Sequence, residues 1–151
     1  MVMSEVSIER VAAAIEHYLA SGRDVAAVAE ALNFEVKDLS LLRAPAANDL
    51  PVEELRLALG YWQELPRVGG VAEGVRIDPG RLRRALGYLM LIDAGLGPYD
   101  FRYALYGSKI AAVAGFDMTG KTVWDIVTSP AVQTFLAACY RAVSKHPGPV
   151  Y

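Results

Sequence analysis

The chain has 151 residues, of which 54% are hydrophobic and 21% are charged, and its formal net charge is −2. This composition predicts a folded globular protein and excludes a disordered one. A net charge near zero gives the surface as a whole no reason to bind nucleic acid or an anionic membrane, and the single cysteine, Cys139, excludes an intrachain disulfide.

The N-terminus has no basic start followed by an apolar run, and no stretch approaches ~18 uninterrupted apolar residues. We therefore expect neither a signal peptide nor a membrane-spanning helix. The single cysteine fits a reducing compartment, so the expected location is the cytoplasm.

The first part of the chain predicts three amphipathic helices. Residues 7–21 carry apolar side chains at helical spacing, between Ser7 as a suitable N-cap and Gly22 as a suitable stop. Residues 24–33 and 35–43 repeat this apolar pattern in shorter segments.

A proline- and alanine-containing linker then separates two predicted units, a helical extension over residues 1–48 and a second domain over residues 49–151. The second unit opens with a helix over residues 51–65, followed by the glycine-rich loop PRVGGVAEG. Asp78 and Pro79 then predict the start of a short helix over GRLRRALGY.

Strand patterns begin at residue 89. The apolar run 89–94 and the alternating run 100–107 predict a β-hairpin, with glycines and a proline in the loop between them. Simple alternation places Phe101, Tyr103 and Leu105 on one face and Arg102, Ala104 and Tyr106 on the other.

Helices return after the predicted hairpin. Residues 108–115 predict a short helix that ends at Gly115 in a left-handed conformation. Ser129 and Pro130 then predict the start of a longer helix that runs to residue 145, and residues 149–151 look like the start of another strand.

Residues 115–122, GFDMTGKT, match the spelling of a Walker-type phosphate loop, G-x-x-x-x-G-K-T. Such a loop follows a buried strand and opens a long helix, so that its amide N–H groups surround the phosphates. Here the preceding segment favours helix and Pro130 follows soon after, so Gly115 and Gly120 are interpreted as turn positions. Nucleotide binding through this loop is kept as an alternative.

Residues 24–43 resemble a helix-turn-helix, with Asn33 at the turn position usually held by glycine. Its second helix carries as many acidic as basic residues, and the whole segment is acidic. Because phosphate neutralisation supplies most of the affinity for DNA, nucleic acid is not the expected partner. A protein-docking element is the preferred interpretation, and a DNA-binding regulator is the alternative.

Candidate catalytic residues are few. His17 and His146 lie near opposite ends of the chain, and Cys139 lies on an apolar helical face, where a cysteine usually acts as a small hydrophobe. The histidines and the cysteine have no metal-ligand spacing, and no G-x-S-x-G elbow is present. We therefore predict that the protein is not an enzyme.

Several motifs in order resemble a bacterial PAS-type sensor family from about residue 55 onward. They are Tyr61-Trp62, Pro66, Asp78-Pro79, Leu91-Ile92-Asp93, Phe101-Arg102-Tyr103, Gly107, Gly115, Asp117 and Thr119-Gly120-Lys121. The resemblance implies an α+β fold with an antiparallel sheet and helices packed on one face. It also implies a role in sensing small ligands or in dimerisation, without catalysis.

In such folds a small cavity lies between the sheet and the long helix that follows it. Carried over to this sequence, the resemblance implies a ligand site lined by Tyr103, Leu105, Trp124, Phe135 and Cys139. The expected ligand is small and hydrophobic or amphipathic, and no cofactor is indicated.

A PAS sheet has three more strands after its long helix, whereas the predicted strands here stop at residue 151. We therefore expect a PAS-like fold that is incomplete at its C-terminus or completed by a partner chain. A two-stranded sheet with an open edge tends to pair with another chain, which predicts a homodimer. The predicted function is a cytoplasmic sensory module that binds a small ligand, a protein partner or both.

Overall fold

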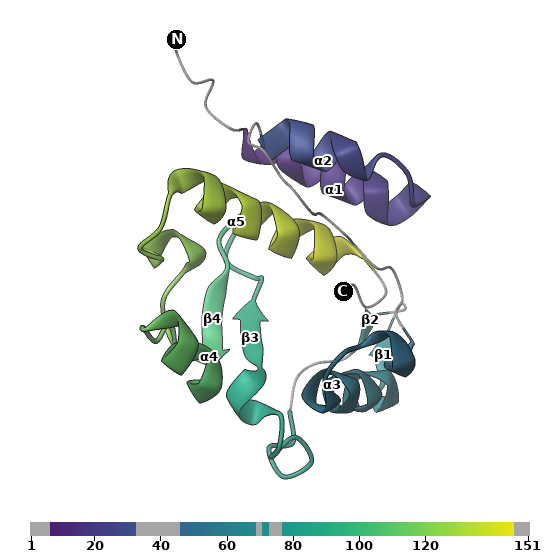
Figure 1. Cartoon of the computed structure of the whole chain (residues 1–151), viewed down its shortest axis with the longest axis vertical. Helices are drawn as coiled ribbons and strands as arrows, with labels where there is room; N and C mark the ends of the chain where they lie inside the picture. The colour runs from purple at the N-terminus through teal and green to yellow at the C-terminus, as the bar shows by residue number, and fades with distance from the viewer. Residues whose placement is uncertain (1–6, 33–45, 69–70, 73–76, 147–151) are drawn as a thin grey trace.

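The computed structural model describes residues 7–32, 46–68, 71–72 and 77–146. This part of the chain contains five α-helices and two short antiparallel hairpins, so the predicted α+β class is confirmed. Helix α5 lies between two layers, with α1 and α2 on one side and the β3–β4 hairpin on the other (Figure 1).

Helices α1 (Ile8–Ser21) and α2 (Val25–Leu32) form where the apolar periodicity predicts them. The hydroxyl of Ser7 caps α1 by accepting a backbone hydrogen bond, and Gly22 ends the helix with a φ of 71°. The third predicted helix, residues 35–43, lies outside the described residues.

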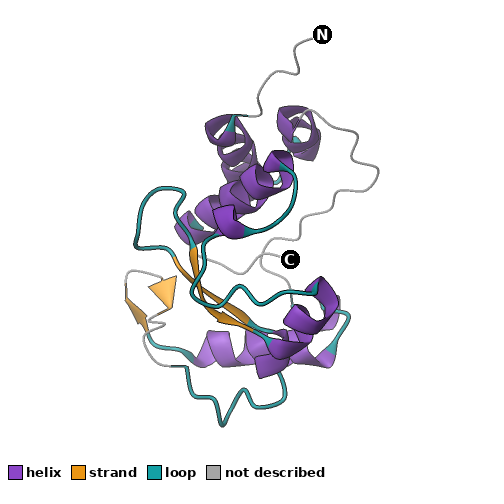
Figure 2. Cartoon of the chain, turned by 90° about the vertical axis from the view of Figure 1, so that its left-hand side faces the viewer, coloured by secondary structure: helices purple, strands orange, loops and turns teal. Residues whose placement is uncertain are grey.

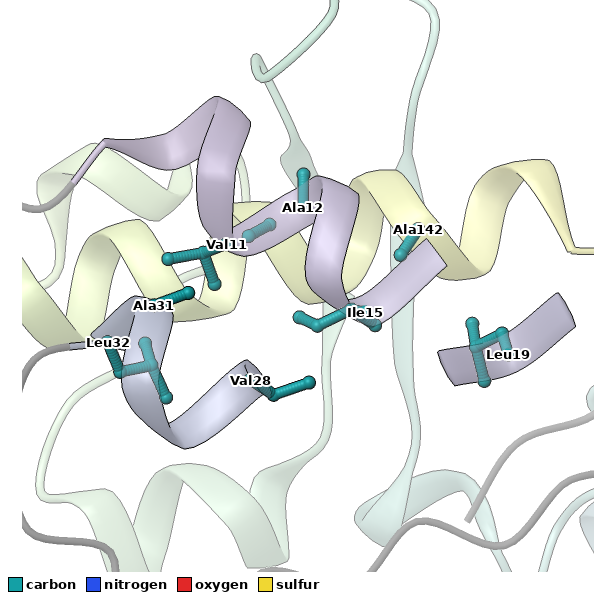
Figure 3. Close-up of a cluster of buried hydrophobic side chains, with 9 residues drawn as sticks. Val11, Ala12, Ile15, Leu19, Val28, Ala31, Leu32 and Ala142 are labelled. Carbon is teal, nitrogen blue, oxygen red and sulfur yellow. The ribbon is translucent and has the colours of Figure 1, made fainter. Parts of the chain in front are cut away.

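The apolar sides of α1 and α2 pack against α5 (Pro130–Lys145) in one aliphatic core (Figure 3). The buried members of this core are Val11, Ala12, Ile15, Leu19, Val28, Ala31, Leu32, Ala138 and Ala142. Alanine on α5 lets the backbones approach closely, and each large aliphatic side chain that is buried contributes about 1.5–3 kcal/mol. The first and last described helices therefore share a core, and the domain boundary near residue 48 stays a prediction.

The middle of the chain is only partly as predicted. Helix α3 (Glu53–Glu64) is confirmed, and the segment expected to be a loop contains a small hairpin, β1 (Arg67–Val68) paired with β2 (Val71–Ala72). Pairing between β1 and β2 gives hydrogen-bond partners to backbone N–H and C=O groups of this glycine-rich segment.

The predicted helix over residues 80–88 is wrong. The chain forms a series of hydrogen-bonded turns that ends in the 3-10 helix η2 (Leu86–Tyr88). Glycine is a poor helix former, and Gly80 and Gly87 both interrupt this segment. Leu82 and Ala85 are buried there against Tyr61 of α3.

The predicted hairpin of β3 (Met90–Asp93) and β4 (Arg102–Tyr106) is confirmed, but it contains a β-bulge. Leu91 lies opposite Leu105, whereas Ile92 lies opposite Tyr103, so Ala104 of β4 is an extra residue. The side chains of Leu91 and Ile92 point to opposite faces of the hairpin because they are adjacent on β3. Their partners on β4, Leu105 and Tyr103, therefore also point to opposite faces.

The bulge therefore overturns the predicted facing of the end of β4. Leu105 lies on the opposite face of the hairpin from Tyr103, and Tyr106 joins the face of Tyr103, with the two ring centroids 5.4 Å apart. An inserted residue shifts the side-chain alternation by one position, and simple period-two reasoning cannot include it.

The last two helices are as predicted. Helix α4 (Ser108–Ala114) ends at Gly115, whose φ is 81°. Ser129 caps α5 by accepting a hydrogen bond from the Val132 amide, and Pro130 occupies its first turn. The strand predicted from residue 149 lies outside the described residues.

Candidate functional site

The stretch that spells a phosphate loop lies along the edge of β4 that faces away from β3. The Tyr103 amide donates to the Lys121 carbonyl at 2.9 Å, and the Gly120 amide donates back to the Tyr103 carbonyl at 2.7 Å. The Val123 amide donates to the Phe101 carbonyl at 3.1 Å. The loop thus closes one edge of the hairpin, and the φ of 81° at Gly120 is the turn that brings it there.

In this arrangement, backbone N–H groups that a bound phosphate would need already donate hydrogen bonds within the chain. All five amides of residues 119–123 donate hydrogen bonds within the chain, three to backbone carbonyls and two to the carboxylates of Asp117 and Asp125. The bond from the Thr119 amide lowers the pKa of Asp117, and the bond from the Thr122 amide lowers the pKa of Asp125, so both stay negative. The turn interpretation is confirmed, and the amides of residues 119–123 are already used within the chain, whereas a nucleotide site needs free amides for its phosphates.

An aromatic cluster lies between the β4 face and α5. Its members are Phe101, Tyr103, Tyr106, Phe116 and Tyr140. Tyr140 of α5 meets Phe101 and Tyr103 edge to face, with centroids 5.6 and 6.1 Å apart, and Phe116 stacks on Tyr106 at 6.3 Å. The two Tyr140 pairs place ring edges against ring faces, which is a favourable arrangement for aromatic pairs, whereas the Tyr106–Phe116 pair is stacked.

Two phenol hydroxyls meet inside this cluster. The Tyr103 and Tyr140 oxygens are 3.0 Å apart and share a hydrogen bond in which either can be the donor. Burial raises the pKa of both phenols, so both are neutral near pH 7. One O–H hydrogen serves the bond between them, and the pair keeps a second O–H hydrogen and several lone pairs for another polar group.

The five residues predicted to line one site are not all brought together. Tyr103 is buried in the aromatic cluster, whereas Phe135 and Cys139 lie on the other side of α5, packed against the aliphatic core with α1. Burial there raises the pKa of Cys139 to about 12, which keeps the thiol protonated and unreactive near pH 7.

Leu105 and Trp124 also lie away from the hydroxyl pair. Leu105 is on the other face of the hairpin because of the bulge, and Trp124, in the 3-10 helix η3 (Val123–Asp125), is 40% exposed. In this segment Val123, and not Trp124, takes the buried position next to Phe101 and Ala137. Whether any of the five residues contacts a ligand stays a prediction.

Sequence reasoning missed Tyr140 and Tyr106. Tyr140 shares a sheet-facing side of α5 with Leu136 and Ala137, at the three- and four-residue spacing of a helical stripe. Since α5 is apolar on two sides, this second stripe was a usable signal. Tyr106 carries no such signal, because its facing depends on the bulge at Ala104.

A family model described as a PAS domain matches residues 51–151, which is more than half of the chain. The chain belongs to the PAS domain family. The matched region contains α3, both hairpins, α4 and α5, whereas α1 and α2 precede it. No characterised protein and no solved structure gives a significant match.

The PAS domain assignment points to a signalling or sensory module in general. No helix in the described part of the chain is long and apolar enough to cross a membrane. Over the same residues, no three side chains among His, Cys, Asp and Glu are grouped as metal ligands would be.

Proposed function

We propose that this PAS domain is a non-enzymatic cytoplasmic sensor that binds a small hydrophobic or amphipathic ligand between the β3–β4 hairpin and α5. The observation that carries the proposal is the part-buried Tyr103–Tyr140 hydroxyl pair within an aromatic cluster. Aromatic rings offer apolar contact to a ligand, and the spare O–H of the pair offers one directional hydrogen bond. The expected ligand therefore combines an apolar body with an oxygen or nitrogen acceptor.

The position of α5 supports a route from the ligand to the rest of the protein. Tyr140 contacts the aromatic cluster, and its neighbour Cys139 packs against the α1–α2 core. A ligand that moves Tyr140 therefore changes the packing of α1 and α2 through one rigid helix. In this proposal the ligand shifts a population between two packings of α5, and a protein partner or a second copy responds to the change.

Native mass spectrometry of the freshly purified chain tests ligand binding. The expected result is a stoichiometric non-covalent adduct whose occupancy falls in Tyr140→Phe, because Phe keeps the ring and removes the hydroxyl. The matched control is Tyr88→Phe, since Tyr88 is 48% exposed and belongs to no described hydroxyl pair. Absence of an adduct, together with no saturable binding of the amphipathic probe 8-anilinonaphthalene-1-sulfonate, would contradict the proposal.

Hydrogen exchange tests the transmission step. Ligand binding is expected to change amide protection in residues 8–21 as well as at the hairpin, because α1 packs on α5 and Tyr103 of the hairpin contacts Tyr140 of α5. Protection that changes only in the hairpin would leave ligand binding in place and overturn the role of α5.

A further inference from the structure

The aromatic cluster connects the Tyr103–Tyr140 hydroxyl pair to the surface of the protein. The ring centroid of Tyr106 is 5.4 Å from that of Tyr103 and 6.3 Å from that of Phe116. Tyr103 is 1% exposed, whereas Phe116, which follows α4, is 37% exposed. Helix α4 lies beside β4 in Figure 1, and Figure 2, viewed from that side, shows the hairpin strands between helices above and below them. The cluster therefore presents aromatic surface to solvent at one end and has its hydroxyl pair at the inner end.

The geometry of the rings favours a ligand with a flat aromatic body. Phe116 and Tyr106 are stacked with 30° between their planes, and Tyr106 meets Tyr103 edge to face at 90°. A planar ring that joins such a cluster gains stacked or edge-to-face contacts, which are worth more than the apolar area that they bury. An alkyl chain of equal area gains only the burial. The cluster therefore discriminates an aromatic ligand from an aliphatic one.

The surroundings of the hydroxyl pair disfavour a charged ligand. Among the described residues, no charged side chain is buried. Burial is the main cause that raises the pKa of Tyr140, followed by its neighbours Tyr103, Cys139 and Tyr106. Phenols, and a thiol whose pKa is about 12, carry no charge near pH 7. A carboxylate bound at the pair would lose its hydration without meeting a cation, which costs free energy.

Lys121, whose carbonyl accepts the Tyr103 amide hydrogen bond, does not supply that cation. Lys121 is exposed and interacts with the carboxylates of Asp117 and Asp125. Hydrogen bonds from Thr119 lower the pKa of Asp117, which follows Phe116 directly, so this carboxylate is negative near pH 7. Two carboxylates around one ammonium leave a net negative charge near the exposed end of the cluster, and this charge disfavours the approach of an anion.

The hydroxyl pair favours an acceptor that brings no hydrogen of its own. One phenol donates the internal hydrogen bond, and the phenol that accepts it keeps its own O–H for an outside group. Accepting a hydrogen bond polarises that phenol and makes its O–H a stronger donor. A carbonyl oxygen is the uncharged group that matches a single strong donor.

We infer that the ligand is an uncharged, planar aromatic compound with a carbonyl group. Its oxygen accepts the outward O–H of the Tyr103–Tyr140 pair, and its ring packs along Tyr106 and Phe116. This inference rests on the proposed sensor function and narrows it, because a fatty acid also combines an apolar body with an acceptor and is excluded here. Tyr103 and Tyr140 are thereby the residues that determine specificity for the ligand.

Three naphthalenes of nearly equal shape test the charge of the ligand. In 2-acetylnaphthalene the ring carries a ketone, in 2-isopropenylnaphthalene a CH₂ group replaces the ketone oxygen, and 2-naphthoate carries a carboxylate. Calorimetric titration of the full chain at pH 7 is expected to show the ketone binding at least about tenfold more tightly than 2-naphthoate. Equal or tighter binding of 2-naphthoate would overturn the uncharged class.

The ketone and its isopropenyl analogue test the hydrogen bond. The ratio of their dissociation constants, analogue over ketone, is expected to fall about fivefold from wild type to Tyr103→Phe/Tyr140→Phe, which is the usual net worth of one hydrogen bond. Tyr106→Phe is the matched control, because it removes a hydroxyl from the same cluster and leaves the pair in place. A ratio that the double variant leaves unchanged, or that Tyr106→Phe lowers, would overturn the role of the pair.

Infrared spectroscopy tests the same hydrogen bond in the wild-type protein, so the test holds even where the double variant fails to fold. The carbonyl stretch of bound 2-acetylnaphthalene is expected at a lower wavenumber than in hexane, and a stretch at the hexane position would overturn the inference. A co-purified adduct that none of the three probes displaces would overturn the ligand class and leave the sensor function in place. Absence of both an adduct and any probe binding would contradict the sensor function itself.

Discussion

The two sides of α5 contact different kinds of side chains. The side toward α1 and α2 is aliphatic, with alanines on α5 and branched residues on its neighbours, and all nine buried members lack polar side-chain atoms. The side toward the hairpin is aromatic and contains the Tyr103–Tyr140 hydrogen bond. Aliphatic contacts stabilise the folded protein but offer no hydrogen bond to a ligand. Phenol hydroxyls, in contrast, can form a hydrogen bond with a polar group of a ligand that comes within reach.

Because of this difference, substitutions on one side of α5 should change the stability of the fold, and substitutions on the other side should change ligand binding. Loss of side-chain volume on the aliphatic side leaves a cavity that nothing polar can fill. Loss of a hydroxyl on the aromatic side removes one hydrogen bond and keeps the rings in place. We therefore expect the larger stability effects on the α1–α2 side and the larger ligand effects on the hairpin side.

The largest expected effect is Ile15→Ala in the aliphatic core. Ile15 is 2% exposed, and its truncation is expected to lower the free energy of unfolding by about 2–5 kcal/mol in urea titrations. Val127→Ala is the control, since Val127 is 93% exposed and its truncation should change stability by no more than ~0.5 kcal/mol. An Ile15→Ala protein as stable as the control would show that α1 does not contribute to the folded core.

Gly107→Ala tests the close backbone approach at the end of the β3–β4 hairpin. A Cβ at Gly107 would lie 2.6 Å from the Gly87 carbonyl carbon, a rigid backbone atom, so we expect a loss of about 1–3 kcal/mol. Gly60→Ala is the matched control, because a Cβ there meets nothing within 4 Å inside α3 and should stabilise the protein by about 0.5–1 kcal/mol. Similar unfolding midpoints for the two variants would contradict the close approach of residues 87 and 107.

Tyr140→Phe tests the hydroxyl pair itself. The substitution leaves the Tyr103 hydroxyl without its partner and is expected to cost about 1 kcal/mol in thermal or urea unfolding. The double variant Tyr103→Phe/Tyr140→Phe should cost less than the sum of the two single variants, because neither oxygen is then left unpaired. Additive single effects in this cycle would show that the two hydroxyls are not coupled.

Unfolding at alkaline pH is a second test of the Tyr103–Tyr140 pair. Burial raises the pKa of both phenols, so the folded state holds their protons more tightly than the unfolded state. The resulting stability is fully present below the unfolded value of about 10 and is lost as the pH rises above it. The double Phe variant should therefore lose less stability than the wild type above about pH 10.

Most elements could be predicted from the sequence, because caps and apolar spacing are local signals. Ser7, Gly22, Gly115 and Ser129 mark helix ends that the structure confirms. The facing of side chains was harder to predict. A single inserted residue, Ala104, reverses the alternation in β4 without any signal in its own identity.

The five residues predicted to line one site lie on different surfaces for a related reason. Helix α5 is covered on two sides, so an apolar residue such as Phe135 or Cys139 fits either side by spacing alone. Only the position of α1 and α2 decides between them, and this is a contact between the two ends of the chain. Local pattern predicts which residues are apolar, but long-range packing decides which neighbours they meet.

The smallest expected effect concerns the rim of the aliphatic side. The Lys145 ammonium lies 2.8 Å from a Glu16 carboxylate oxygen and joins the end of α5 to α1. Since both side chains are partly exposed, Lys145→Met should cost only about 0.2–1 kcal/mol, and the difference from wild type should shrink at 1 M salt. A larger, salt-independent loss would mean that the methylene chain of Lys145 packs on α1, and the aliphatic contact would then extend to the end of α5.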